Sequence, residues 1–162
     1  MESLHAPWRI EYIRDPNREQ GQESVFADIA RSKDDIGNHV IARTRSSFAL
    51  LNSYPYNGGH VLVLPYREVH DICDLVNEEL LDLMLLVNRC KKAIAKVMKP
   101  EGFNIGINLG SVAGAGIESH LHIHVVPRWE GDTNFMPVTG QTHVLPEALV
   151  DIASKLRTAL TS

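Results

Sequence analysis

The chain has 162 residues, 44% of them hydrophobic, and a formal net charge of −4 at pH 7. This length is typical of one globular domain with a single core. The mild acidity excludes the broad basic surface of a nucleic-acid-binding protein, and an anionic small molecule would have to be held by local donors. No segment reaches the roughly 20 apolar residues of a transmembrane helix, so no membrane partner is expected.

The chain contains two cysteines, Cys73 and Cys90, whose spacing matches no metal motif. A low cysteine content without a recognisable secretory signal is typical of the reducing cytoplasm. Cytoplasmic localisation is therefore the expectation.

The first half of the chain predicts a short helix and three strands. A polar N-terminal extension covers residues 1–23, and a turn cluster rich in Pro, Asn and Gly precedes the third strand. The strands are rich in β-branched and aromatic residues, and the third is apolar on both faces. The expected helix covers residues 24–31, and the expected strands cover 38–44, 47–52 and 60–65.

A long amphipathic helix is expected next. Asn77 suits the N-cap, and Glu78 and Glu79 suit the first turn, where they complement the helix dipole. Apolar residues recur at helical spacing as far as Met98, and Pro100 ends the helix.

The second half of the chain predicts two more strands and a final helix, with a glycine-rich loop between the strands. The fold class is therefore α+β: one domain over residues 1–162, with an antiparallel sheet of about five strands, one long helix and a C-terminal helix. The expected strands cover 103–108 and 120–126, the loop covers 109–117, and the helix runs from Pro146 to about Leu160.

Three histidines, His120, His122 and His124, alternate with apolar residues in the segment HLHIHVV. Because side chains alternate along a strand, all three imidazoles are expected on one face. A purely structural cluster is one alternative. A zinc site is another, built from two of these histidines with His60, since residues spaced by about 6.6 Å cannot all reach one tetrahedral ion. Nucleophilic attack on phosphorus is favoured, because neutral imidazole is a good nucleophile near about pH 7.

The loop before these histidines contains Gly110, Gly114 and Gly116. Glycines let backbone N–H groups approach an anion closely, so a phosphate cradle is expected, although a plain connection between strands is the alternative. Ser119, beside His120, either donates to a phosphate oxygen or caps the strand.

The segment HLHIHVV resembles the His-φ-His-φ-His-φ-φ signature of the histidine-triad (HIT) superfamily, where φ is hydrophobic. Phe48 to Asn52, followed by Gly59 to Pro65, resembles the nucleoside-binding hairpin of the same family. The likeness defines a nucleotide-binding core over residues 47–127. The flanks at 6–13 and 126–138 are similar to a bacterial branch related to diadenosine tetraphosphate phosphorylases.

The resemblance implies roles for individual residues. His122 would be the nucleophile that forms a nucleotidyl-histidine intermediate, and His124 would contact the α-phosphate. His120 would orient the polar network, and Ser119 would assist the leaving group. The substrate-binding residues implied are Asn52 for the ribose, Phe48 and Leu51 with Leu50 for the base, Asn108, Gly114 and Gly116 for the phosphates, and His60 as a hydrogen-bonding group.

The resemblance also implies a homodimer that works without a resident cofactor. Many family members bind zinc through a Cys-x-x-Cys pair, but the comparable place here reads Ser24-Val25-Phe26-Ala27. No protein-bound metal is therefore expected, and a divalent cation would enter with the substrate.

The implied activity is that of a hydrolase or phosphorylase acting on the α-phosphate of dinucleoside polyphosphates such as diadenosine tetraphosphate. A nucleoside phosphoramidase is an alternative within the same site. A slow nucleotide-binding regulatory protein and a metal-dependent hydrolase are alternatives from other classes.

Overall fold

The computed structural model describes residues 24–132 and 148–161. The predicted extension at 1–23 and the predicted helix start at Pro146 lie outside these residues. Within them the α+β class is confirmed, because five antiparallel strands form one sheet in the order β1-β2-β3-β5-β4. The elements are α2 (Val25–Arg31), β1 (Val40–Arg43), β2 (Ser47–Leu51), β3 (Val61–Pro65), η2 (Ile72–Asp74), α3 (Asn77–Met98), β4 (Gly102–Ile107), η3 (Ser111–Ala113), β5 (Ile123–Arg128) and α5 (Leu149–Thr161).

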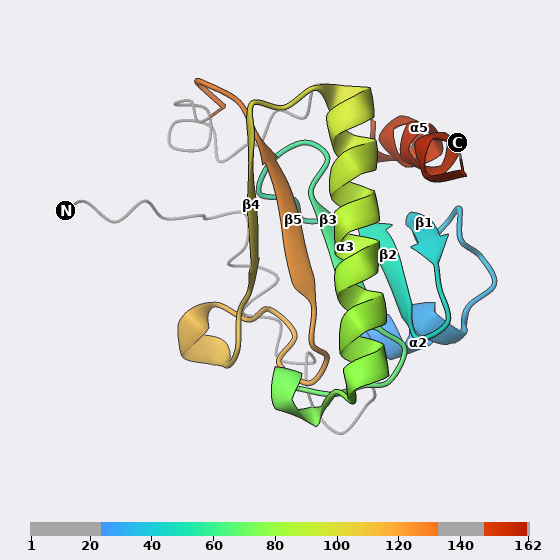
Figure 1. Cartoon of the computed structure of the whole chain (residues 1–162), viewed down its shortest axis with the longest axis vertical. Helices are drawn as coiled ribbons and strands as arrows, with labels where there is room; N and C mark the ends of the chain where they lie inside the picture. The colour runs from blue at the N-terminus through green and yellow to red at the C-terminus, as the bar shows by residue number, and fades with distance from the viewer. Residues whose placement is uncertain (1–23, 133–147, 162) are drawn as a thin grey trace.

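The sheet has helices on both faces. The long helix α3 crosses one face with α5 beside it, and α2 lies behind the sheet in this view (Figure 1). The larger core fills the space between the sheet and α3 and α5, which explains the apolar stripe predicted for the long helix. Fully buried members of this core include Leu51, Val61, Leu86, Ile94 and Leu156.

A smaller core lies on the opposite face and explains why β2 and β3 are buried on both sides. Phe48 is paired with Leu64, and Leu62 is paired with His124, so these side chains share a face. The register therefore carries His124 to the α2 side of the sheet. The buried members of this core are Phe26, Val40, Phe48, Leu50, Leu62 and Leu64.

Helix α3 has the predicted bounds, but its N-cap is Val76 rather than Asn77. The reason is local: the carboxylate of Glu79 reaches back and accepts the Val76 N–H at 3.1 Å. At the other end Lys99 takes a left-handed conformation with φ of 50°, and Pro100 follows. No helix among the described residues combines the length and the apolar composition that a bilayer span requires.

The fifth strand begins later than predicted. It starts at Ile123 instead of residue 120, so His120 and His122 precede it. The Leu121 N–H donates to the carbonyl of Val69 at 2.6 Å, and the His120 carbonyl accepts a side-chain bond from His122. These backbone groups are therefore unavailable to a strand ladder. Leu121 and Ile123 still enter the larger core, as the alternation predicts.

Candidate active site

His122 is held in one tautomer by its own segment. Its Nδ1 lies 2.8 Å from the carbonyl oxygen of His120. Because a carbonyl can only accept, Nδ1 carries the proton and the ring lone pair is on Nε2. The ring is 6% exposed, so it is shielded from solvent on most sides. This arrangement sets the direction in which the neutral imidazole presents its nucleophilic nitrogen.

His60 and His124 form a second, connected pair. The Tyr56 N–H donates to His60 Nδ1 at 3.1 Å, so the proton of His60 is on Nε2. That Nε2 lies 3.0 Å from His124 Nδ1 and donates to it, which places the proton of His124 on its Nε2. The His122 and His124 rings lie 4.9 Å apart between centroids. His124 can therefore donate to an oxygen on the phosphorus that His122 attacks.

His120 is fully buried and binds only protein groups through its ring. Its Nε2 donates to the carbonyl of Pro65 at 2.9 Å, and its Nδ1 accepts from the Ser24 hydroxyl at 2.9 Å. Burial lowers the pKa of His120, although the bond to Pro65 and the charge of Glu68 oppose the shift. Through these two bonds His120 connects the end of β3 to the start of α2.

Acidification is expected to destabilise the fold through His120. Its pKa in the folded protein lies below the value of about 6.5 expected when unfolded, so the unfolded chain binds more protons in that window. Its contribution to stability is complete above about pH 6.5 and is lost as the pH falls toward the folded pKa. Thermal unfolding from about pH 8 to about pH 5 checks this for wild type and His120→Asn. The variant should show the weaker pH dependence, and equal slopes would contradict the assignment.

Asn52 lies beside the His60–His124 pair, but its amide is engaged in its own loop. Its Oδ1 accepts the Tyr54 N–H at 2.9 Å, and its Nδ2 lies 3.2 Å from His60 Nδ1. Asn52 therefore helps to orient His60, in addition to the ribose contact expected from the sequence. The Tyr56 ring stacks on His60 with centroids 4.8 Å apart, and this residue was not predicted.

Two residues expected to line the base pocket, Leu51 and Phe48, are fully buried. Leu51 faces α3 in the larger core, on the opposite side of the sheet from His124, because neighbouring strand residues alternate. Phe48 lies on the same side as His124 but is fully buried, stacked against Tyr66 at 5.4 Å between centroids. Both are core residues here.

The predicted phosphate loop connects β4 to His120 (Figure 1). Gly110 and Gly114 have φ of 79° and 87°, a left-handed range that favours glycine. The Asn108 amide nitrogen lies 3.5 Å from the Gly114 carbonyl and closes the loop. Gly116 is half-buried, and Ser119 is exposed at the end of the loop.

Helix α2 also contributes to the site, which the sequence did not indicate. Ser24 is its N-cap and bonds His120, and the Phe26 ring lies 5.8 Å from the His120 ring and 5.5 Å from the His122 ring. Ser24 and His120 are 96 residues apart, so no local pattern in the sequence links them.

The ring nitrogens of His120 and His60 are occupied by contacts within the chain. Within residues 24–132 and 148–161, no group of three His, Cys, Asp or Glu side chains is placed to hold a metal ion. Both ring nitrogens of His120 bond to a hydroxyl and a carbonyl, and His60 Nε2 bonds to His124.

The fold and the histidine cluster are those of a known protein family. Residues 33–131 match the model of the HIT domain, and the chain belongs to this family. It is 40% identical over 164 aligned residues to a Mycobacterium tuberculosis protein named AP-4-A phosphorylase, covering 98% of this chain and 84% of the relative.

Two further relatives are more distant or shorter. A Schizosaccharomyces pombe protein named bis(5'-nucleosyl)-tetraphosphatase (asymmetrical) is 41% identical over 101 residues, covering 62% of this chain and 55% of the relative. The crystal structure of a zinc-bound histidine triad family protein from Mycobacterium smegmatis superposes with a TM-score of 0.68 at 27% identity. That match covers 85% of this chain and 92% of the other.

Proposed function

We propose that this protein cleaves dinucleoside polyphosphates at the α-phosphate through a nucleotidyl-histidine intermediate on His122. The observation that carries the proposal is the bond from His122 Nδ1 to the His120 carbonyl, which puts the lone pair on Nε2. The donor assigned to His124 beside it supplies the matching charge stabilisation. The names of the relatives support the substrate class.

The reaction would proceed by double displacement. His122 Nε2 forms a bond to the α-phosphorus while the bond from phosphorus to the leaving polyphosphate oxygen breaks. Water or inorganic phosphate then attacks the same phosphorus, and the phosphorus–nitrogen bond breaks to release the nucleotide and regenerate neutral His122. Positioning and electrostatic stabilisation dominate such transfers, and the His60–His124 pair supplies both.

The acceptor decides between a phosphorylase and a hydrolase. The mycobacterial relative spans nearly the whole chain and is named a phosphorylase, so we propose inorganic phosphate as the acceptor. Diadenosine tetraphosphate incubated with phosphate should give ADP and ATP, and no product should form without phosphate. AMP and ATP in both tubes would make the protein a hydrolase. An absence of product in both would favour the phosphoramidase or the slow nucleotide-binding alternative.

We propose that the reaction needs no resident cofactor, because the imidazole itself is the nucleophile and the donors belong to the chain. A divalent cation would arrive with the polyphosphate. We also propose the cytoplasm as the site of action, supported by Cys73 and Cys90, which are both free thiols.

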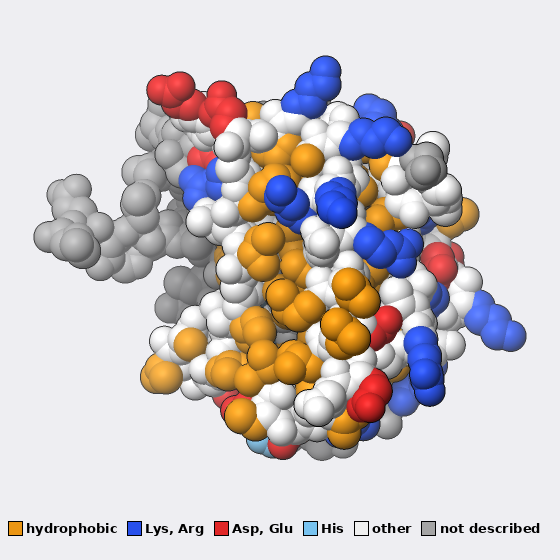
Figure 2. All heavy atoms as spheres, in the orientation of Figure 1, with side chains coloured by type: hydrophobic (Ala, Val, Ile, Leu, Met, Phe, Trp, Pro, Cys, Tyr) orange, Lys and Arg blue, Asp and Glu red, His pale blue; other side chains and the backbone are white. Residues whose placement is uncertain are grey.

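A homodimer is the proposed assembly, with a second copy on the β4 side. β4 is an edge strand of the sheet, and its Ile105 is exposed. Hydrophobic side chains gather over the lower half of α3 and beside it toward β4 (Figure 2), and the exposed residues of α3 include Leu81, Met84 and Leu85. Sedimentation velocity should give a dimer for wild type and a monomer for Leu85→Glu. A monomeric wild type would contradict the proposal.

A further inference from the structure

Helix α2 and its N-cap make three contacts with the histidines, yet the helix has only seven residues. Isolated helices of this length are unstable in water, so bonds from outside the helix must hold it in place. We propose that Arg43 is the residue that does so, and that it acts as a positioning residue for His122 through α2. The inference rests on the proposed nucleophilic role of His122.

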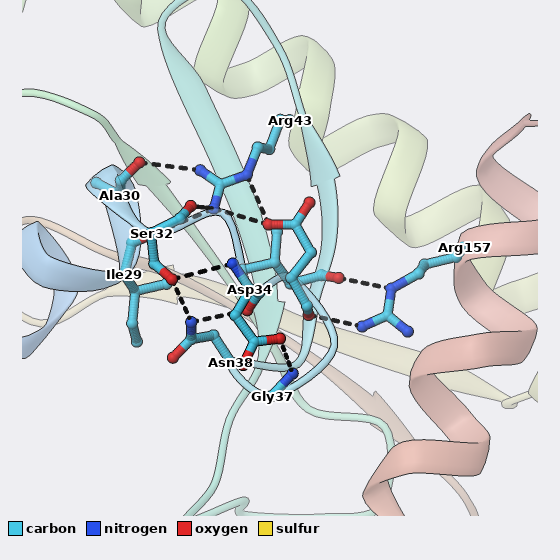
Figure 3. A network of polar contacts seen from close by, with 10 residues as sticks. Ile29, Ala30, Ser32, Asp34, Gly37, Asn38, Arg43 and Arg157 are labelled. Carbon is cyan, nitrogen blue, oxygen red and sulfur yellow. Dashed lines mark hydrogen bonds and ion pairs between the residues drawn. The ribbon is translucent and has the colours of Figure 1, made fainter.

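The Arg43 guanidinium binds the C-terminal end of α2 (Figure 3). Its two terminal nitrogens donate to the carbonyls of Ala30 at 3.1 Å, Ile29 at 3.1 Å and Ser32 at 2.9 Å. The last carbonyls of a helix lack partners within the helix, and a positive charge there is favourable. The Nε of Arg43 donates to Asp35 at 2.9 Å, which fixes the plane of the guanidinium.

Arg43 also anchors this end of α2 to the sheet. It lies in β1, and its guanidinium carbon is 5.7 Å from the ring centroid of Phe48 and 5.9 Å from that of Tyr66. Phe48 is fully buried in β2, so the cation rests on a rigid surface. Arg43 therefore fixes the position of α2 relative to β1 and β2.

The opposite end of α2 meets the triad. The Ser24 hydroxyl donates to His120 Nδ1, and the Phe26 ring contacts the rings of His120 and His122. The carbonyl of His120 in turn orients His122. A displaced α2 would shift this carbonyl, and small misplacements of a nucleophile have large costs in rate.

Arg157 offers a matched control in the same network (Figure 3). It is half-buried like Arg43, and it donates to the carbonyls of Val40 at 2.7 Å and Asp35 at 2.9 Å. It therefore ties α5 to β1 and the preceding loop, whereas the described contacts of Arg43 reach α2 itself. Loss of either arginine removes bonds to backbone carbonyls, but only loss of Arg43 releases the end of α2.

The test compares Arg43→Met, Arg43→Lys and Arg157→Met in the full chain. With diadenosine tetraphosphate, Arg43→Met should lower kcat about 10-fold or more with KM little changed, while both methionine variants lower Tm. Arg43→Lys should fall between wild type and Arg43→Met, because lysine keeps the charge without the planar fork. Arg157→Met should keep its kcat.

A second readout does not depend on turnover. The ring-nitrogen NMR shifts of His122 report its tautomer, and they should move in Arg43→Met and stay in Arg157→Met. Equal effects of the two methionine variants on these shifts, or no effect of either, would overturn the positioning role. If wild type shows no turnover while the shifts still differ, the proposed function fails and the positioning role stands.

Discussion

Replacing His122 with alanine is expected to lower kcat by about 10³-fold or more, the scale seen when an enzyme loses its nucleophile. The reason is geometric as well as chemical. In the neutral ring the lone pair is on Nε2, because Nδ1 donates to the His120 carbonyl. The neighbouring imidazole of His124 is not expected to replace it, since its proton is assigned to Nε2 by the bond that His60 donates to Nδ1.

Steady-state kinetics with diadenosine tetraphosphate would measure the loss, and denaturation at alkaline pH, where a phosphorus–nitrogen bond to histidine survives, would trap the labelled nucleotidyl-enzyme in wild type only. His70→Ala is the matched control, because the His70 side chain is 77% exposed and takes no part in the triad network. Near-normal turnover in His122→Ala, or a covalent intermediate that survives the substitution, would exclude the mechanism.

The second large effect is expected for His124→Ala, with kcat falling by about 10²–10³-fold, the scale for loss of one preorganised donor. The His124 proton is assigned to Nε2 because His60 donates to the other ring nitrogen and the Tyr56 N–H donates to His60. Because negative charge on the phosphate oxygens is redistributed in the transition state, the donor should affect kcat more than KM.

The variant His60→Phe distinguishes the orientation of His124 by His60 from the hydrogen bond that His124 donates to the substrate. It keeps an aromatic ring in a fully buried position but removes the bond to His124, so its loss in kcat should be smaller than that of His124→Ala. Full activity in His124→Ala would show that the assigned donor does not act on the substrate.

The parts of the fold that depend on local chemistry were predicted well. The bounds of α3 follow from the acidic first turn, the apolar spacing and Pro100, which all lie within or beside the helix. The start of β5 was predicted three residues too early, because the Leu121 N–H donates to the carbonyl of Val69, which is distant in the sequence. Such distant partners leave no local pattern.

The candidate site divides in the same way. The alternation of histidine with apolar residues correctly placed Leu121 in the core and the imidazoles on the other side. The packing of β2 was harder to predict, because its residues are apolar on both faces and alternation could not show that Leu51 packs under α3. The backbone N–H of Tyr56 donates to His60, and the guanidinium of Arg43 donates to the carbonyl of Ala30. Neither partner could be identified from the sequence.

The bond between His122 and His120 spans only two residues, so the direction of the attacking nitrogen is encoded within a single short peptide. Groups that recognise the rest of the substrate would come from loops separated in sequence from that peptide. Such loops can vary in length and composition while the reacting atom stays in register. Chemistry and selectivity can therefore diverge independently, which allows one reaction to be matched to different nucleotides by changes that never touch the triad.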